Sequence, residues 1–171
     1  MTNNCAERNE PFIRYFLEKI GTCQDLPISD LNTIPTTCGL YVFYVKFNPT
    51  SKERYPIYAG ITRRSFRQRF KEHDSPGGVI YKVANGEFPK NFRNLSLHAY
   101  LVNFPAVTSK FIESVLLEAF DFCLNTDENV GIRDNLDIDD QFPAEDSKHN
   151  FDISWGNIIG SIQEVDKFYR N

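Results

Sequence analysis

Two short β-type runs joined by a polar turn constrain the fold of this chain more than any other feature. Residues 39–47 are β-branched, aromatic or aliphatic at nearly every position, and a second run of this kind covers residues 56–59. Such runs on either side of polar turn residues are typical of a β-hairpin. The pattern then changes to a helical period over 65–73, where Phe66 and Phe70 fall on one face. The sequence therefore predicts a hairpin followed directly by an amphipathic helix.

The remaining segments add helices and one further strand. Residues 9–20 and 109–123 have apolar side chains at helical spacing, and residues 95–102 are predicted to form a third strand. The polar residues 22–37 are expected to form a connecting loop, and a short helix is expected over 160–169. The order helix, strand, strand, helix, strand, helix predicts an α+β domain around a small antiparallel or mixed sheet.

Length and composition indicate a single globular domain. The chain has 171 residues, of which 41% are hydrophobic, enough for one buried core. No apolar run approaches the roughly 18 residues that span a bilayer, and the polar first ten residues do not resemble a signal peptide. We therefore expect a cytoplasmic protein with no membrane partner. The 4 cysteines form no Cys-x-x-Cys pair, so free thiols are expected and a structural zinc site is not.

Charge is segregated along the chain in a way that the net charge of −4 conceals. Residues 38–105 carry 11 basic and 4 acidic side chains, whereas residues 106–171 carry 5 basic and 14 acidic ones. The basic density peaks between Arg63 and Lys71, where five cations and no acid occur. A basic segment in an acidic protein is a candidate footprint for a polyanion, although a run of charge also marks an ordinary solvated helix face. The acidic last third disfavours DNA binding unless it faces away from the duplex.

Side chains suited to phosphodiester chemistry recur along these elements. Two phenols, a guanidinium, an imidazole, a carboxylate and an amide can together hold a divalent ion, stabilise a pentavalent phosphorus and deprotonate water. Taken alone, each residue also has a structural interpretation, as a packing tyrosine, a surface charge or a helix cap. The six candidates are Tyr41, Tyr58, Arg69, His73, Glu113 and Asn125.

The tripeptides in the two β-type runs, Gly39-Leu40-Tyr41 and Tyr58-Ala59-Gly60, resemble the paired tripeptides of the GIY-YIG nuclease family. The pattern continues with Arg69-x-x-x-His73 on the following helix, and with Asn125 twelve residues after Glu113. This spacing is most similar to the compact type II restriction endonucleases of that family. Six positions in register along the chain make a far more specific signal than two degenerate tripeptides.

The resemblance implies a fold, a domain organisation and a reaction. The fold is a small three-stranded antiparallel sheet flanked by helices, formed by a nuclease core over 38–130. A helix-and-loop extension over 1–37 precedes this core, and an acidic C-terminal extension covers 131–171. The reaction is hydrolysis of phosphodiester bonds in double-stranded DNA, with Mg²⁺ or Mn²⁺ as the cofactor and Glu113 as its ligand. Cutting both strands implies a homodimer on DNA.

The same resemblance implies a role for each of the other five residues. Tyr41 is the general base, with its proton relayed to His73, and Tyr58 orients the water or contacts the scissile phosphate. Arg69 stabilises the phosphate, and Asn125 orients groups beside it. A free phenol has a pKa of about 10, so Tyr41 needs a nearby cation or proton acceptor to act at neutral pH.

Basic residues of the middle third are expected to contact DNA phosphates, which gives affinity and position but not sequence recognition. Residues 79–94, whose secondary structure is ambiguous from the sequence, are the expected site of base recognition. The expected DNA-contacting residues are Arg63, Arg64, Arg67, Lys71, Lys82, Lys90 and Arg93.

Other interpretations remain open at this point. A GIY-YIG nuclease can serve a mobile element, DNA repair or an antibacterial toxin, although such proteins usually carry an added domain that 171 residues barely permit. A nucleic-acid-binding module without catalysis, or an interaction domain with structural tyrosines, would leave the full set of six residues or the segregated charge unexplained.

Overall fold

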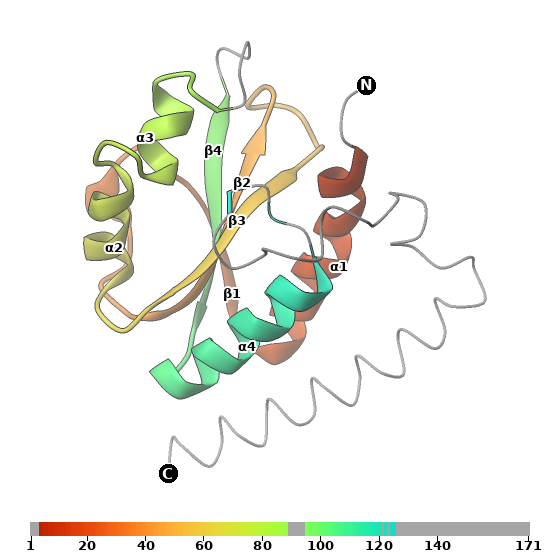
Figure 1. Cartoon of the computed structure of the whole chain (residues 1–171), viewed down its shortest axis with the longest axis vertical. Coiled ribbons are helices and arrows are strands. Elements are labelled where there is room, and N and C mark those ends of the chain that lie inside the picture. Colours follow the sequence, from red (N-terminus) through yellow and green to blue (C-terminus); the bar gives the residue numbers. More distant parts are fainter. Residues whose placement is uncertain (1–3, 89–94, 121, 123, 126–171) are drawn as a thin grey trace, which may run out of the picture.

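The computed structural model describes residues 4–88, 95–120, 122 and 124–125. Within these ranges the chain forms one four-stranded antiparallel sheet with helices on both faces (Figure 1). The strands are ordered β1-β4-β2-β3 across the sheet. In chain order the elements are α1 (Asn4–Ile20), β1 (Cys23–Pro27), the 3₁₀ turn η1 (Leu31–Thr33), β2 (Gly39–Lys46), β3 (Tyr55–Thr62), α2 (Phe66–His73), α3 (Val79–Ala84), β4 (Ser96–Asn103) and α4 (Ala106–Ala119).

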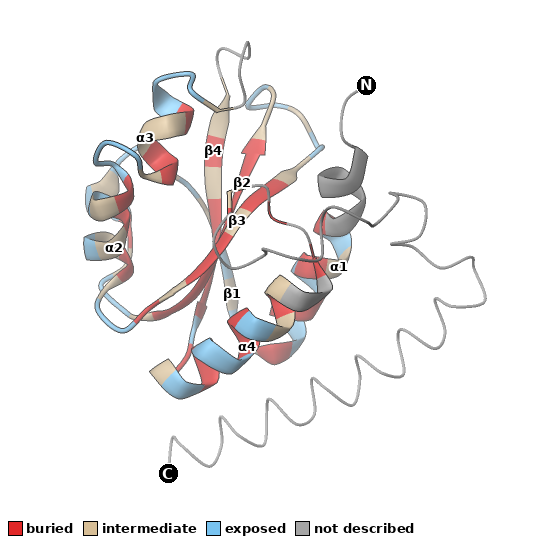
Figure 2. Cartoon of the chain, viewed as in Figure 1, coloured by how far each residue is buried: buried red, intermediate tan, exposed pale blue. Residues whose placement is uncertain are grey.

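Both faces of the sheet are covered, so the central strands are apolar at almost every position. On β2, Leu40, Val42 and Tyr44 point to the face covered by α1 and α4, whereas Tyr41 and Phe43 point to the face covered by α2 and α3. Figure 2 shows burial concentrated along these strands and on the sides of the helices that face them. This double coverage explains the continuous apolar run from which the strand was predicted.

The sheet has four strands, so the predicted number of three strands is wrong. The additional strand, β1, lies within the predicted loop 22–37 and pairs antiparallel with β4, from Cys23 opposite Val102 to Pro27 opposite His98. Its sequence is poor in strand-forming residues, so the free edge of β4 induces the strand rather than its own propensity. The broader prediction, an α+β fold with a small antiparallel sheet flanked by helices, is confirmed.

Helix boundaries also differ from the predicted ones. α1 begins at Asn4, five residues earlier than predicted, and includes Pro11 beyond the first turn, where proline is usually unfavourable. The apolar stripe that follows Pro11 is buried against the sheet, and this burial outweighs the lost backbone hydrogen bond. α4 begins at Ala106 and ends at Ala119, three and four residues earlier than predicted, because Phe120 turns to an extended conformation.

α1 and β1 belong to the same folded unit as the central strands. α1 packs against the central strands, β1 pairs with β4, and η1 contacts α2. The ambiguous segment 79–94 contains the short helix α3 at its start. The predicted helix over 160–169 and the acidic extension over 131–171 lie outside the described residues. Among the described helices, none has both the length and the hydropathy needed to cross a membrane.

Candidate active site

Tyr41 lies at the centre of the candidate site, fully buried between the sheet and α2. The register of β2 and β3 places it directly opposite Gly60. A Cβ atom on residue 60 would lie 2.6 Å from Tyr41 Oη, too close for a real contact. Tyr58, on the same face of β3 as Gly60, stacks on Tyr41 with ring centroids 6.1 Å apart and an interplanar angle of 27°. The glycine of the second tripeptide thus makes room for the tyrosine of the first.

Helix α2 brings an imidazole and a guanidinium to the Tyr41 hydroxyl. Tyr41 Oη lies 2.7 Å from His73 Nε2, and Arg69 Nε donates to Tyr41 Oη at 3.2 Å. Arg69 and His73 can reach the same atom because residues four apart share a helix face. Ser65 caps the N-terminus of α2 by accepting a hydrogen bond from the Gln68 amide, which sets where the helix starts.

Burial and neighbouring charge set the protonation states of this cluster. Burial, and then the Arg69 guanidinium, lower the pKa of His73 to about 4. The imidazole is therefore neutral at pH 7, and an unprotonated Nε2 can accept from the Tyr41 hydroxyl. Burial, with the help of Tyr58, raises the pKa of Tyr41 above its ordinary value, against the opposing effect of Arg69. The central contact is thus a neutral phenol beside a neutral imidazole.

Asn125 is bound to the backbone of β3. Its Oδ1 accepts from the Ala59 amide at 2.9 Å, and its Nδ2 donates to the Ala59 carbonyl at 2.8 Å. β3 is an edge strand, so this side chain satisfies two backbone groups that have no neighbouring strand. Asn125 therefore holds the second tripeptide in place, and its predicted role at the scissile phosphate remains a prediction.

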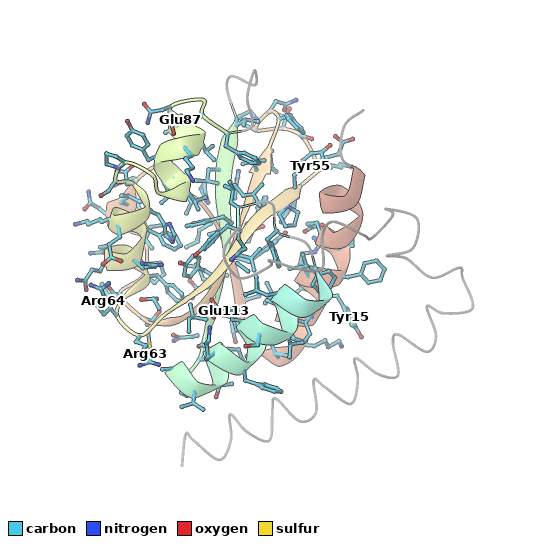
Figure 3. The ribbon with its side chains drawn as sticks, in the orientation of Figure 1. Tyr15, Tyr55, Arg63, Arg64, Glu87 and Glu113 are labelled. Atoms are coloured by element: carbon cyan, nitrogen blue, oxygen red, sulfur yellow. The ribbon has the colours of Figure 1, made fainter. Side chains whose placement is uncertain are left out.

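Glu113 belongs to the helix layer on the other face of the sheet. It is 5% exposed, and its Oε2 accepts from Lys110 Nζ at 2.8 Å. α4 packs against β2 and β3, and Figure 3 shows Glu113 on the side of α4 that faces the strands. The described contacts therefore bring together four of the six predicted residues, Tyr41, Tyr58, Arg69 and His73. Asn125 joins them through Ala59.

The chemistry of Glu113 suits one type of metal site. Among the described residues, no three His, Cys, Asp or Glu side chains gather into a metal-binding group. Mg²⁺ needs only one or two protein carboxylates, because waters and substrate phosphate oxygens complete its coordination. A buried carboxylate with an exposed lysine as its partner fits that mode, since the lysine can leave when another cation arrives.

The predicted DNA-contacting residues in the described part of the chain lie around α2 and α3. Arg63 and Arg64 are exposed in the loop between β3 and α2, and Figure 3 shows them together at that end of the molecule. Lys71 on α2 is also exposed, whereas Lys82 on α3 is half-buried. Two further predicted contacts, Lys90 and Arg93, lie outside the described residues.

Three contacts of α2 were not predicted from the sequence. Arg67 Nε donates to the Ile34 carbonyl at 2.9 Å, so this arginine also anchors the helix to the preceding turn. Glu72 Oε2 accepts from Arg69 Nη1 at 2.9 Å, and Glu72 Oε1 forms an ion pair with Arg64 Nη2. The available signal was the (i, i+3) spacing of Arg69 and Glu72, since residues three apart are neighbours on a helix.

A second polar network lies on the opposite face of the sheet. Tyr44 Oη and Arg54 Nη1 both donate to the Asp25 carboxylate, and Arg54 also donates to Tyr100 Oη. Tyr100 in turn donates to Glu10 on α1. Because these groups satisfy one another, the network joins α1, β1 and the β2–β3 turn to the sheet, and its role is structural.

Comparison of the chain with protein-family models, with curated proteins and with solved structures finds no match. A functional assignment therefore depends on the geometry of the site itself. That geometry is a buried tyrosine hydroxyl in contact with both an imidazole and a guanidinium, with exposed arginines on the adjoining loop.

Proposed function

We propose that this protein is a metal-dependent endonuclease that hydrolyses phosphodiester bonds in double-stranded DNA, a GIY-YIG nuclease of the restriction type. The observation that carries the proposal is the contact of Tyr41 Oη with both His73 and Arg69, beside Tyr58. A tyrosine that only packs in a core needs one hydrogen-bond partner. A neutral proton acceptor and a permanent cation at one hydroxyl are what an assisted general base requires.

The proposed reaction begins with removal of a proton from the attacking water. Water gives its proton to Tyr41 Oη while the Tyr41 proton moves to His73 Nε2, so no free phenolate accumulates. This relay is consistent with the raised pKa of Tyr41, which disfavours ionisation of the phenol alone. A DNA phosphate beside Arg69 adds negative charge near His73 and raises the pKa of its imidazole, which improves it as the final acceptor.

Arg69 and Tyr58 are proposed to act on the phosphate. Arg69 Nε donates to Tyr41 Oη. The other N–H groups of the partly exposed Arg69 guanidinium can bind a phosphate oxygen as negative charge develops on the phosphate. Tyr58 is less buried than Tyr41, so its hydroxyl can meet the water or the phosphate. Loss of one such donor typically slows an enzyme by about 10²–10³-fold.

Glu113 is the proposed ligand of the Mg²⁺ or Mn²⁺ ion. When bound, the ion supplies charge stabilisation at the scissile phosphate. In the structure Lys110 balances the carboxylate, and its side chain is 58% exposed, so it can move into solvent without breaking the core. Glu113 would hold the ion once Lys110 had moved away, and until then the lysine is the charged partner of the carboxylate.

The exposed cations near α2 form the proposed DNA surface, with Arg63, Arg64 and Lys71 as phosphate contacts. Contacts of this kind make affinity strongly dependent on salt. Base recognition is proposed for the segment 79–94. Symmetric cleavage of both strands is proposed to require a homodimer, which meets its DNA in the cytoplasm.

Plasmid digestion with mapped ends tests this function. Wild-type protein should cut duplex DNA in Mg²⁺ and should stop cutting in EDTA. Glu113→Gln should reduce the rate by at least about 10²-fold. Glu18→Gln is the matched control, because it removes an exposed carboxylate on α1, outside the cluster and the proposed DNA surface, and should leave cleavage unchanged.

The alternatives give different results. Full cleavage by Glu113→Gln would contradict its role as metal ligand, and duplex binding without any cleavage would indicate a non-catalytic nucleic-acid-binding module. A small set of defined ends would support the restriction type, whereas scattered ends would favour a toxin or repair nuclease of the same family.

A further inference from the structure

Glu72 stands between two arginines beside the candidate site. Its Oε2 accepts from Arg69 Nη1 at 2.9 Å, and its Oε1 pairs with Arg64 Nη2. It directly precedes His73 on α2, and its side chain is 36% exposed. A carboxylate here repels DNA phosphates, so on a DNA-binding surface it lowers affinity. Any contribution of Glu72 to the reaction must therefore come through its contacts with Arg64 and Arg69.

Arg69 is held at two points of its guanidinium. Nε donates to Tyr41 Oη at 3.2 Å, and Nη1 donates to Glu72. A guanidinium is planar and carries five N–H donors, so two contacts in different directions fix its plane. The other three N–H groups have no partner among the described residues, and the side chain is 36% exposed. These donors are therefore oriented and accessible to a phosphate.

Arg64 has a different environment. It lies in the loop between β3 and α2, its side chain is 55% exposed, and Glu72 is its ion-pair partner. Such a side chain would otherwise sample many rotamers. Because one carboxylate holds both guanidinium groups, Arg64 and Arg69 are kept next to each other, an arrangement that suits neighbouring phosphates of one strand.

We propose that Glu72 is a positioning residue that orients Arg69 and Arg64 toward two neighbouring phosphates of a DNA strand. This inference rests on the proposed nuclease function. The charge of Glu72 weakens binding of DNA in the ground state, whereas the orientation of Arg69 favours the transition state, where charge develops on the phosphate. Removing Glu72 should therefore have opposite effects on binding and on turnover.

Glu72→Gln is the decisive variant, because glutamine keeps the shape and one acceptor oxygen but loses the charge. Duplex binding is measured in EDTA over a range of salt concentrations, and cleavage is measured under single-turnover conditions in Mg²⁺. Glu72→Gln should bind DNA more tightly, with the slope of log Kd against log salt steeper by about 1. Its cleavage rate should fall by about 10- to 100-fold. Glu72→Ala, which loses both acceptors, should cut more slowly still.

Controls separate positioning from folding and from bulk charge. Glu18→Gln makes the same charge change at an exposed position on α1, outside the proposed DNA surface, and should leave the cleavage rate unaltered. The melting temperatures of both Glu72 variants should stay near that of wild type, because exposed ion pairs contribute little to stability. Adding Arg64→Gln to Glu72→Gln should cancel the gain in binding, since the released guanidinium is then absent.

Wild-type cleavage by Glu72→Gln would overturn the inference while leaving the nuclease function intact. Weaker binding together with a lowered melting temperature would also overturn it, because Glu72 would then be structural. An inert wild-type protein would overturn the proposed function and this inference with it, so the two failures are distinguishable.

Discussion

Gly60 illustrates how the site depends on a single absent side-chain atom. A Cβ at this position would meet Tyr41 Oη at 2.6 Å and Tyr58 Cε1 at 2.8 Å. The requirement is steric, because the contacts are with two rings that are themselves packed against α2. The site can therefore form only where residue 60 has no side chain.

Gly60→Ala is expected to destabilise the fold by about 1–3 kcal/mol through overpacking and to abolish cleavage by displacing Tyr41. Denaturant unfolding and plasmid digestion measure the two effects. Gly77→Ala is the control, because a Cβ there meets nothing within 4 Å and only its φ of +88° adds strain. That control should lose about 1–2 kcal/mol and keep its activity. An active Gly60→Ala enzyme would show that the close approach to Tyr41 is not required.

His73 should make stability depend on pH in a defined window. Its pKa is about 4 in the folded protein, below the ordinary value of 6.5 that applies to the unfolded chain. Between these values the unfolded state binds more protons, so the stabilisation is complete above pH 6.5 and is lost as the pH falls to 4. The loss should amount to roughly 2–3 kcal/mol.

Denaturant unfolding between about pH 4 and pH 7 measures this contribution, and His73→Gln should flatten the profile. Burial lowers the pKa of His98 as well, so the His98→Gln profile shows how much of the slope comes from that residue. An unchanged slope in His73→Gln would mean that other groups carry the dependence.

At the scale of elements, the exposed edge of β3 is the weak point of the sheet. The structure closes it with a side chain, since Asn125 mimics a paired strand at Ala59 and the Leu124 amide donates to the Ile57 carbonyl. The backbone amide hydrogens of an uncovered edge strand otherwise exchange with solvent, or the strand pairs with another chain. The position of Tyr58 therefore depends on a residue 67 positions away in the chain.

Asn125→Ala should leave the buried amide and carbonyl of Ala59 without partners, which costs about 2–4 kcal/mol in total. The Ala59 amide should exchange with deuterium faster than the amides of the central strand β2. Asn85→Ala, which loses a hydrogen bond to the exposed C-terminal turn of α3, should change stability by less than about 1 kcal/mol. Unaltered protection at Ala59 would show that the edge is closed by other means.

At the scale of the whole molecule, the N-terminal helix completes the core on one face of the sheet. Its buried residues, Ile13, Phe16, Leu17 and Ile20, contact the same cluster as Val42 on β2. Buried side chains of this size contribute about 1.5–3 kcal/mol each, so together they approach the entire stability of a typical domain.

A chain lacking residues 1–37 is therefore expected to lose cooperative unfolding, even though the six candidate residues are all retained. Circular dichroism during denaturant titration measures this. Tyr15→Ala in the full chain is the matched control, because Tyr15 is 53% exposed on the outer side of α1 and should change stability little. Cooperative unfolding of the truncated chain would indicate that the remaining residues fold without the 1–37 extension.

Local patterns in the sequence were sufficient for the elements that carry most of the site. The hairpin, α2 and α4 were predicted because strand runs, turn residues and helical spacing are patterns among residues close together in the sequence. The pairing of Arg69 with His73 followed from their spacing on one helix. The same patterns predicted an α+β domain with a small antiparallel or mixed sheet, but not β1 or the short helix α3.

Only the tertiary structure decided the features that depend on distant partners. β1 is a strand because β4 offers it an edge, α1 continues through Pro11 because its apolar stripe is buried, and Asn125 closes β3. The link between Glu72 and Arg64 likewise forms only when the loop before α2 folds back on the helix. Burial and hydrogen-bond satisfaction are properties of the assembled chain, so they override local propensity where the two disagree.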